Sequence, residues 1–199
     1  MLRTTLLNPR QLTLTAVKER TALLSWRELA FAVIGGIALA GVERLLGPTF
    51  HSIWPVPMSG SVAVTLPRTL ILLAILLRTK RFGALTVVGI AEVSTRLAMG
   101  FVGFWPMSLV VPVLAGVAGD IIWQYLQHLP SRRTGLILTG GCLCGARILL
   151  ALSCWLLLMR PLAAAKPNPA LIMAAIVLIN VVLGMVAGLL VGKSVRTGR

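Results

Sequence analysis

Long apolar segments separated by short polar connections dominate the chain. Each segment is close to the roughly 20 residues that a helix needs to cross the hydrocarbon core of a bilayer. We judge the segments by apolar length, which is the main sequence signal for a membrane-spanning helix. They cover residues 29–46, 61–77, 83–100, 108–126, 135–159 and 170–191. The pattern therefore predicts an all-α integral membrane protein with six transmembrane helices.

The composition supports this prediction. Of the 199 residues, 57% are hydrophobic and 12% are charged, whereas about 25% of a soluble globular domain is charged. The mean hydropathy is +0.93. We expect one membrane domain over residues 26–199, preceded by a basic segment over residues 1–25. That segment is predicted to be a helix on the cytoplasmic membrane surface, or alternatively a disordered basic tail.

Lysines and arginines gather in the connections on one predicted side of the membrane. The net charge of +14 would suggest a nucleic-acid partner in a soluble protein, but positive-inside topology and anionic lipid account for it here. The basic residues on this side include Arg27, Arg78, Lys80, Arg81, Arg132, Arg133 and Lys193. Both termini are therefore predicted to be cytoplasmic, which requires an even number of spans. The protein is predicted to lie in the inner cell membrane.

Ionisable side chains interrupt the third and fourth segments. Glu92 and Arg96 lie four residues apart and share a helix face, while Asp120 lies in the fourth segment. A charge at bilayer depth costs at least about 2.5–3.5 kcal/mol, so it is usually paired, hydrated or functional. Glu92 and Arg96 are expected either to neutralise one another or to reach into a polar pocket.

Two further polar residues lie within the last two segments. Arg147 lies near the middle of the fifth segment, where a bridge to Asp120 would join adjacent helices. Asn180 lies near the middle of the sixth segment. Its amide is expected to donate an interhelical hydrogen bond or to contact a ligand.

The predicted outer connections combine aromatic residues with proline. His51 and Trp54 lie in the first of them, and Phe104 and Trp105 in the second. Proline stiffens a loop, and aromatic rings supply broad amphipathic contact area. These loops are therefore predicted to form a lid over a small organic ligand, or alternatively an aromatic belt at the membrane interface.

Small residues recur every four positions in several segments. In the first segment they are Ala32, Gly36 and Ala40. Such a stripe lets another helix approach closely. The stripes of the later segments are expected to pack the bundle itself, whereas the first is predicted to dock a separate membrane protein.

No catalytic, metal-binding or cofactor-binding motif is evident. The chain lacks HExxH, GxSxG, P-loop and dinucleotide-binding patterns, and it has too few acids for paired-carboxylate catalysis. Cys142 and Cys144 have the wrong spacing for a CxxC site, so these cysteines and Cys154 are interpreted as packing residues. We therefore expect a protein that is not an enzyme and that carries no cofactor or metal.

Taken together, these features resemble the substrate-binding S components of energy-coupling factor (ECF) transporters. The resemblance covers the chain from about Ser25 to its end, and the third and fourth segments are most similar to the branch that handles thiamine-type precursors. It depends on six spans in 199 residues, the stripe Ala32-xxx-Gly36-xxx-Ala40, the turn RTKRFGAL, the terminal glycine of RLAMG and the stretch GVAGDIIWQYL.

The resemblance implies high-affinity capture of a vitamin or related micronutrient near the outer face. The implied ligand contacts are His51, Trp54, Glu92, Arg96, Phe104, Trp105 and Asn180, and the implied docking residues are Ala32, Gly36 and Ala40. The implied partners are a membrane T component and two cytoplasmic ATPases. Thiamine-type members carry an acid where this chain has Arg96, so an anionic or zwitterionic ligand is at least as well supported as a cationic one.

A protein of a different class would also fit the sequence. A non-transporting membrane scaffold or assembly subunit would use the glycine-rich helix faces to hold its partners. Such a scaffold would tolerate substitution of Trp54, Trp105 and Arg96 but not Gly36→Leu, whereas a binding subunit would be damaged by both kinds of change.

Overall fold

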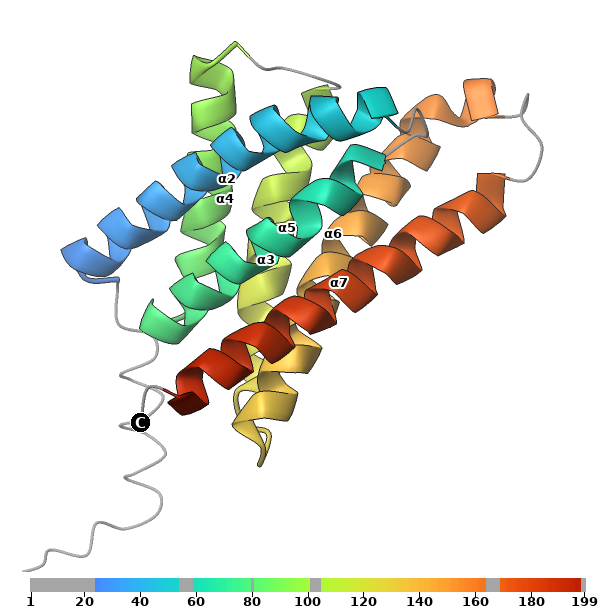
Figure 1. The fold of residues 1–199 in the computed structure, drawn as a ribbon. Coiled ribbons are helices and arrows are strands. Elements are labelled where there is room, and N and C mark those ends of the chain that lie inside the picture. The colour runs from blue at the N-terminus through green and yellow to red at the C-terminus, as the bar shows by residue number, and fades with distance from the viewer. Residues whose placement is uncertain (1–23, 54–58, 80, 101–104, 164–168, 198–199) are drawn as a thin grey trace, which may run out of the picture.

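The computed structural model describes residues 24–53, 59–79, 81–100, 105–163 and 169–197, and all regular structure within them is helical (Figure 1). The helices are α2 (Trp26–Ile53), α3 (Ser59–Thr79), α4 (Ala84–Ala98), α5 (Trp105–Leu126), α6 (Arg132–Ala163) and α7 (Pro169–Thr197). Five of them are long and apolar enough to cross a membrane. The predicted fold class, an all-α membrane protein, is therefore confirmed. The basic segment over residues 1–25 lies almost wholly outside the described residues and stays a prediction.

Helix α4 is shorter than the others. Its 15 residues rise about 22 Å, compared with about 30 Å for the hydrocarbon core. Glycine with positive φ stands at both ends, with φ of 91° at Gly83 and 66° at Gly100. Because residues with a side chain rarely adopt this conformation, these two positions fix where α4 begins and ends.

Five of the described helices are longer than the apolar pattern predicts, and in two of them the extension takes in a residue that was predicted to lie in a loop. Helix α2 continues through Pro48 to Ile53, so His51 belongs to its last turn rather than to a loop. Helix α5 begins at Trp105, which was likewise expected in a loop. A helix end needs no continuous apolar run, so the apolar length underestimates both helices.

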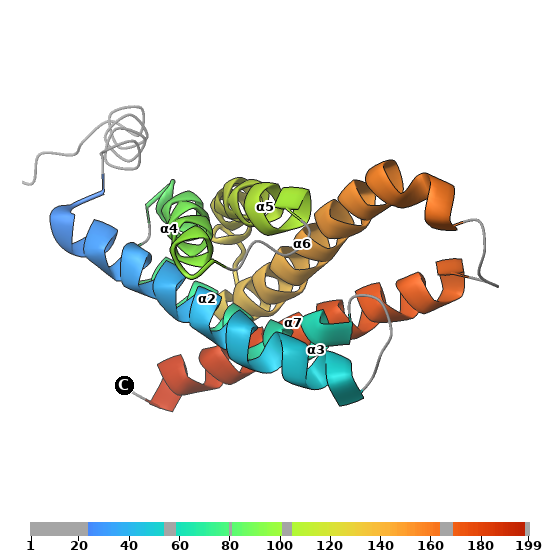
Figure 2. The same cartoon turned by 90° about the horizontal axis from the view of Figure 1, so that it is seen from above.

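The helices form a closed ring. Helix α2 packs against α4, α4 against α5, α5 against α6, α6 against α7, α7 against α3, and α3 returns to α2. Helix α3 also touches α4 and α6 across the interior. Figures 1 and 2 show that α2 begins and α7 ends at the same end of the bundle, as an even number of spans requires.

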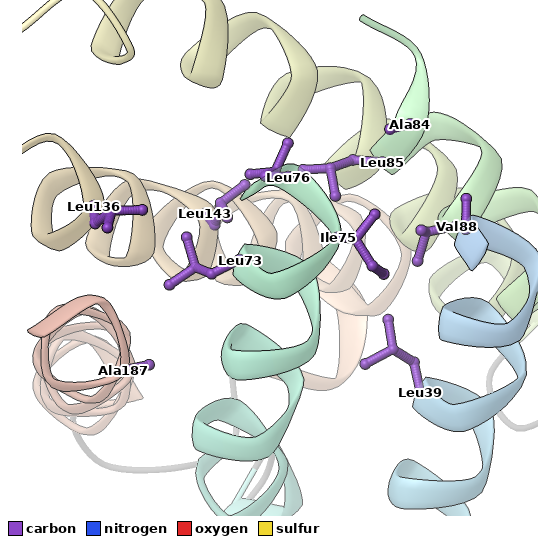
Figure 3. Packing of buried hydrophobic residues seen from close by; sticks show 11 residues of the cluster. Leu39, Leu73, Ile75, Leu76, Ala84, Leu85, Val88, Leu136, Leu143 and Ala187 are labelled. Atoms are coloured by element: carbon purple, nitrogen blue, oxygen red, sulfur yellow. The ribbon is translucent and has the colours of Figure 1, made fainter. Parts of the chain in front are cut away.

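Apolar side chains from most of the ring meet in one core (Figure 3). Leu39 of α2, Leu73 and Leu76 of α3, Leu85 of α4 and Leu136 of α6 are essentially inaccessible to solvent. Large apolar residues also cover the outside, for example Ile34, Ile90, Leu149 and Leu178, each at least half exposed. Many exposed large apolar side chains suit a lipid environment.

The small-residue stripe of α2 faces α4 of the same chain. Ala32 and Ala40 are buried, and a Cβ on Gly36 would lie 2.6 Å from the Val88 carbonyl oxygen and 2.9 Å from the Glu92 nitrogen. The glycine is needed because two backbones touch there. The prediction that these three residues dock a separate protein is therefore wrong for this arrangement, because the stripe is already covered.

Candidate functional site

Five charged side chains from four helices meet inside the ring, and we call them the charge cluster. They are Glu43 of α2, Arg68 of α3, Glu92 and Arg96 of α4, and Arg147 of α6. The side-chain exposure rises from 0% at Glu92, 4% at Arg96 and 6% at Arg68 to 14% at Arg147 and 22% at Glu43. Glu43 is therefore the most accessible member.

Glu92 lies at the fully buried end of the cluster. Arg68 donates from Nη1 and Nη2 to its two carboxylate oxygens, both at 2.7 Å. Arg96, one helical turn further along α4, also donates to Oε1. A bidentate guanidinium–carboxylate pair is among the strongest hydrogen-bonded arrangements in proteins. The expected pairing of Glu92 with Arg96 is confirmed, and Arg68 is an additional partner.

Glu43 contacts all three arginines, but most of these contacts are longer than the 2.7 Å bonds between Arg68 and Glu92. Its Oε2 lies 3.5 Å from Arg68 Nη1, and both of its oxygens lie 3.3 Å from Arg147 Nη2. Arg96 Nη2 also donates to Glu43 Oε2. Helices α2 and α6 are not neighbours in the ring, so the contact between Glu43 and Arg147 crosses the interior of the bundle.

The cluster does not balance its own charge. Three arginines face two glutamates, which leaves one net positive charge when all five are ionised. Arg68 Nε is buried and has no hydrogen-bond partner within the described part of the chain. Uncompensated charge and an unpaired donor are both costly away from water.

A cavity lies beside the cluster, between α3, α4, α5 and α6. Its polar wall includes Thr65, Arg68, Cys144 and Arg147. Its volume is about 20 Å³, and a single water molecule needs about 10–15 Å³ measured in the same way. The cavity therefore has room for a water molecule but not for a larger ligand. Its apolar wall comprises Leu72, Leu85, Val88, Gly89, Pro112, Ala115, Gly116, Leu143 and Ile148.

Neutral polar side chains continue from the cavity wall toward α7. Thr65 donates to Asn180 Oδ1, and Asn180 Nδ2 donates to the Ile176 carbonyl at 2.8 Å. Thr69 and Cys144 lie 2.9 Å apart, oxygen to sulfur. Asn180 Nδ2 also donates to Ser61 Oγ of α3 at 3.5 Å, so the predicted interhelical bond is confirmed. Together with the Thr65 bond, it connects α7 to the α3 wall of the cavity.

Asp120 is separate from the charge cluster. Its carboxylate accepts hydrogen bonds from the Leu85 nitrogen at 3.1 Å and from the Thr86 nitrogen and hydroxyl at 2.9 and 2.7 Å. It therefore caps the first turn of α4 from the neighbouring helix α5. The expected bridge between Asp120 and Arg147 is replaced by these bonds, and Arg147 pairs with Glu43 instead.

The predicted site residues divide into two groups. Glu92, Arg96 and Asn180 are placed in or beside the cluster and cavity, as described above. Trp54 and Phe104 lie outside the described residues, and the side chains of His51 and Trp105 do as well, so a lid made by these four stays a prediction.

Sequence reasoning misses Glu43 and Arg68 as site residues. A charged residue within an apolar segment marks a candidate site residue, and both residues are of this kind. Arg68 was instead assigned to the end of its span, and Glu43 was not singled out. The cluster therefore has more members, from more helices, than the sequence pattern indicates.

The groups present suit an anion better than a metal ion. No group of three or more His, Cys, Asp and Glu side chains able to hold a metal occurs among the described residues, and the guanidinium groups of the cluster repel cations. Comparison with protein-family models, curated proteins and solved structures found no match to this chain.

Proposed function

We propose that this protein is the substrate-binding subunit of an ECF-type transporter, which captures a small vitamin or micronutrient in the inner cell membrane. The observation that carries the proposal is the charge cluster, with its excess of arginine, beside a cavity inside a closed ring of helices. ATP hydrolysis would take place on partner chains, a membrane T component and cytoplasmic ATPases.

Stability alone does not explain such a cluster. Replacing buried ion pairs by apolar side chains of similar volume is often neutral or stabilising. An apolar interior would therefore make the bundle at least as stable as the charge cluster does. Ionisable residues within membrane segments commonly mark substrate pathways or binding sites. The net positive charge in particular is costly to the protein alone and useful to a protein that binds an anionic or zwitterionic ligand.

Binding of a vitamin requires the bundle to open. Small-molecule sites usually occupy about 300–1,000 Å³, far more than the cavity of about 20 Å³. The residues that line the cavity belong to α3, α4, α5 and α6. We expect these helices to separate toward the predicted outer face when a ligand enters.

The direct test is to identify a bound molecule. The full chain would be purified from cells grown in rich medium, and small molecules released from it would be identified by mass spectrometry. A panel of vitamins would then be titrated into the protein in lipid nanodiscs. A vitamin that binds in the submicromolar range supports the proposal, whereas an empty preparation that binds none of the panel contradicts it.

A non-transporting scaffold remains the second candidate, and the filled apolar interior favours it. The two candidates differ at Arg147, which lines the cavity and makes only 3.3 Å contacts with Glu43. A scaffold would tolerate Arg147→Gln, while a binding subunit would lose ligand affinity. Gly36→Leu no longer separates them, because Gly36 packs inside the bundle and the change would disrupt either protein.

A further inference from the structure

We infer that the Glu43 carboxylate occupies an oxyanion-binding site formed by Arg68, Arg96 and Arg147, and that a carboxylate or phosphate group of the ligand takes its place. The inference rests on the proposed function and deepens it, because it names the chemical class of the ligand and the residues that recognise it. It also locates recognition within the ring of helices rather than at the aromatic outer loops.

The two glutamates differ in how firmly they are held. Glu92 is fully buried and receives two 2.7 Å bonds from Arg68. Glu43 is 22% exposed; Arg96 donates a close hydrogen bond to it, but its contacts with the other two arginines, Arg68 and Arg147, are 3.3–3.5 Å long. Contacts of that length are weaker than charge-assisted bonds of 2.7–2.9 Å. Glu43 is therefore the carboxylate that an incoming anion displaces, while Glu92 keeps two of the arginines in position.

The position of the arginines supports entry from the cavity. Arg68 and Arg147 line the cavity, and Arg68 Nε is a buried donor with no hydrogen-bond partner among the residues that the structure describes. An oxyanion in the place of the Glu43 carboxylate would lie between these two guanidinium groups. The cavity alone has room only for a water molecule, so the incoming carboxylate or phosphate group takes the position that the Glu43 carboxylate leaves.

Charge balance separates the two ligand classes. Without Glu43, three arginines and Glu92 leave two positive charges. A carboxylate restores the balance present with Glu43, whereas a phosphate group, with a charge of about −1.5 to −2 at pH 7, comes close to neutralising the cluster. Phosphate is therefore expected to bind more tightly than a carboxylate of similar size.

Displacement of Glu43 would also reach the helices. Glu43 is the member of the cluster that belongs to α2, and it contacts arginines on α3, α4 and α6. An anion that takes over these arginines releases α2 from three of its polar contacts at once. Binding is thereby coupled to the packing of α2 against the rest of the ring.

The test is a titration of the full-length protein in nanodiscs of neutral lipid, followed by calorimetry. The probes are acetate, inorganic phosphate and, as a cation, tetramethylammonium. We expect acetate and phosphate to bind and tetramethylammonium not to bind. Glu43→Gln removes the competing carboxylate, so affinity for both anions should rise about tenfold or more. Arg147→Gln should lower affinity by about tenfold or more, and Arg147→Lys should restore part of the loss.

Matched controls come from the same helices. Glu28→Gln matches Glu43→Gln, because it removes a negative charge from α2 where Glu28 pairs with Arg81 away from the cluster. Arg132→Gln matches Arg147→Gln, because it removes a positive charge from α6 at an exposed position. Both should leave anion affinity unchanged. An equal effect of Glu43→Gln and Glu28→Gln would overturn the inference. If Glu43→Gln does not fold, equal anion binding by wild type and Arg147→Gln would overturn it as well.

The result separates this inference from the proposed function. A vitamin that co-purifies and binds equally well to wild type, Glu43→Gln and Arg147→Gln would overturn the oxyanion site and leave the binding subunit in place. Conversely, anion binding that depends on Arg147, in a protein that binds no vitamin, would support the site and contradict the transport role.

Discussion

Glu92 and Asp120 are both buried acids, with 0% and 1% of their surfaces exposed, but their partners differ in kind. Asp120 accepts bonds only from neutral groups at the start of α4, and these satisfy it locally. Glu92 belongs to a set of charges from four helices, in which arginines outnumber acids. The bonds of Asp120 are fully accounted for by its role as the cap of a helix. The charge cluster around Glu92 has an excess positive charge that an anionic molecule can neutralise.

The largest expected effect is loss of the Arg68–Glu92 pair. Arg68→Met leaves Glu92 with one arginine partner in a buried site, and breaking a buried pair typically costs about 3–5 kcal/mol. Unfolding of the purified protein in mild detergent, followed by circular dichroism, would measure the loss. The double variant Arg68→Met/Glu92→Leu removes both charges and should regain most of the stability. A double variant less stable than Arg68→Met would contradict this account of the cluster.

The next effect concerns the contact that places α2 beside Glu92. An alanine Cβ at Gly36 would lie 2.6 Å from Ala91 Cβ and from the Val88 carbonyl oxygen, so the helices must separate. Overpacking of this kind costs about 1–3 kcal/mol. Gly41→Ala is the matched control on the same helix, because nothing lies within 4 Å of the added carbon.

Gly41→Ala should therefore be neutral, or stabilising by about 0.5–1 kcal/mol through its helix propensity. Thermal unfolding of both variants in the same detergent gives the comparison. Equal stability of the two variants would show that α2 does not approach α4 as closely as described.

Asp120 provides the opposite case to Glu92. Asp120→Ala removes the acceptor for three donors at the start of α4, and loss of such a cap costs about 0.5–2 kcal/mol. Asp120→Asn keeps one acceptor oxygen and should lose less. Neither change should alter acetate or phosphate affinity under conditions where the protein is folded. An effect on anion affinity as large as that of Arg147→Gln would remove the distinction between the two acids.

The apolar pattern predicts the helices but not their partners. Each segment marked its helix because apolar length is a local property. The pairs of the cluster join residues 24, 53 and 104 positions apart, namely Arg68–Glu92, Glu43–Arg96 and Glu43–Arg147. Those pairs depend on which helices are neighbours in the ring, and no local pattern encodes that order.

The stripe of α2 illustrates the same limit. Its small residues correctly predicted a close helix contact, but the sequence does not state whose helix makes it. In the structure the neighbour is α4 of the same chain, whose Val88 and Glu92 backbone atoms meet Gly36. The assignment to a separate protein was therefore wrong in the partner and correct in the kind of packing.

The smallest effect is expected at the other end of α4. Arg44 Nη1 donates to the Met99 carbonyl at 3.1 Å, so a cation from α2 lies at the C-terminal end of α4, opposite the Asp120 carboxylate at its start. A charge of suitable sign at a helix end contributes about 0.3–1 kcal/mol, and an exposed position such as this is sensitive to salt. Arg44→Gln should thus lower stability slightly at low salt and hardly at all at about 0.5 M salt. It should leave anion affinity unchanged, since Arg44 is absent from the cavity wall. If Arg44→Gln weakened phosphate binding as much as Arg147→Gln, long-range charge rather than contact would account for anion recognition, and the contrast between the helix caps and the charge cluster would fail.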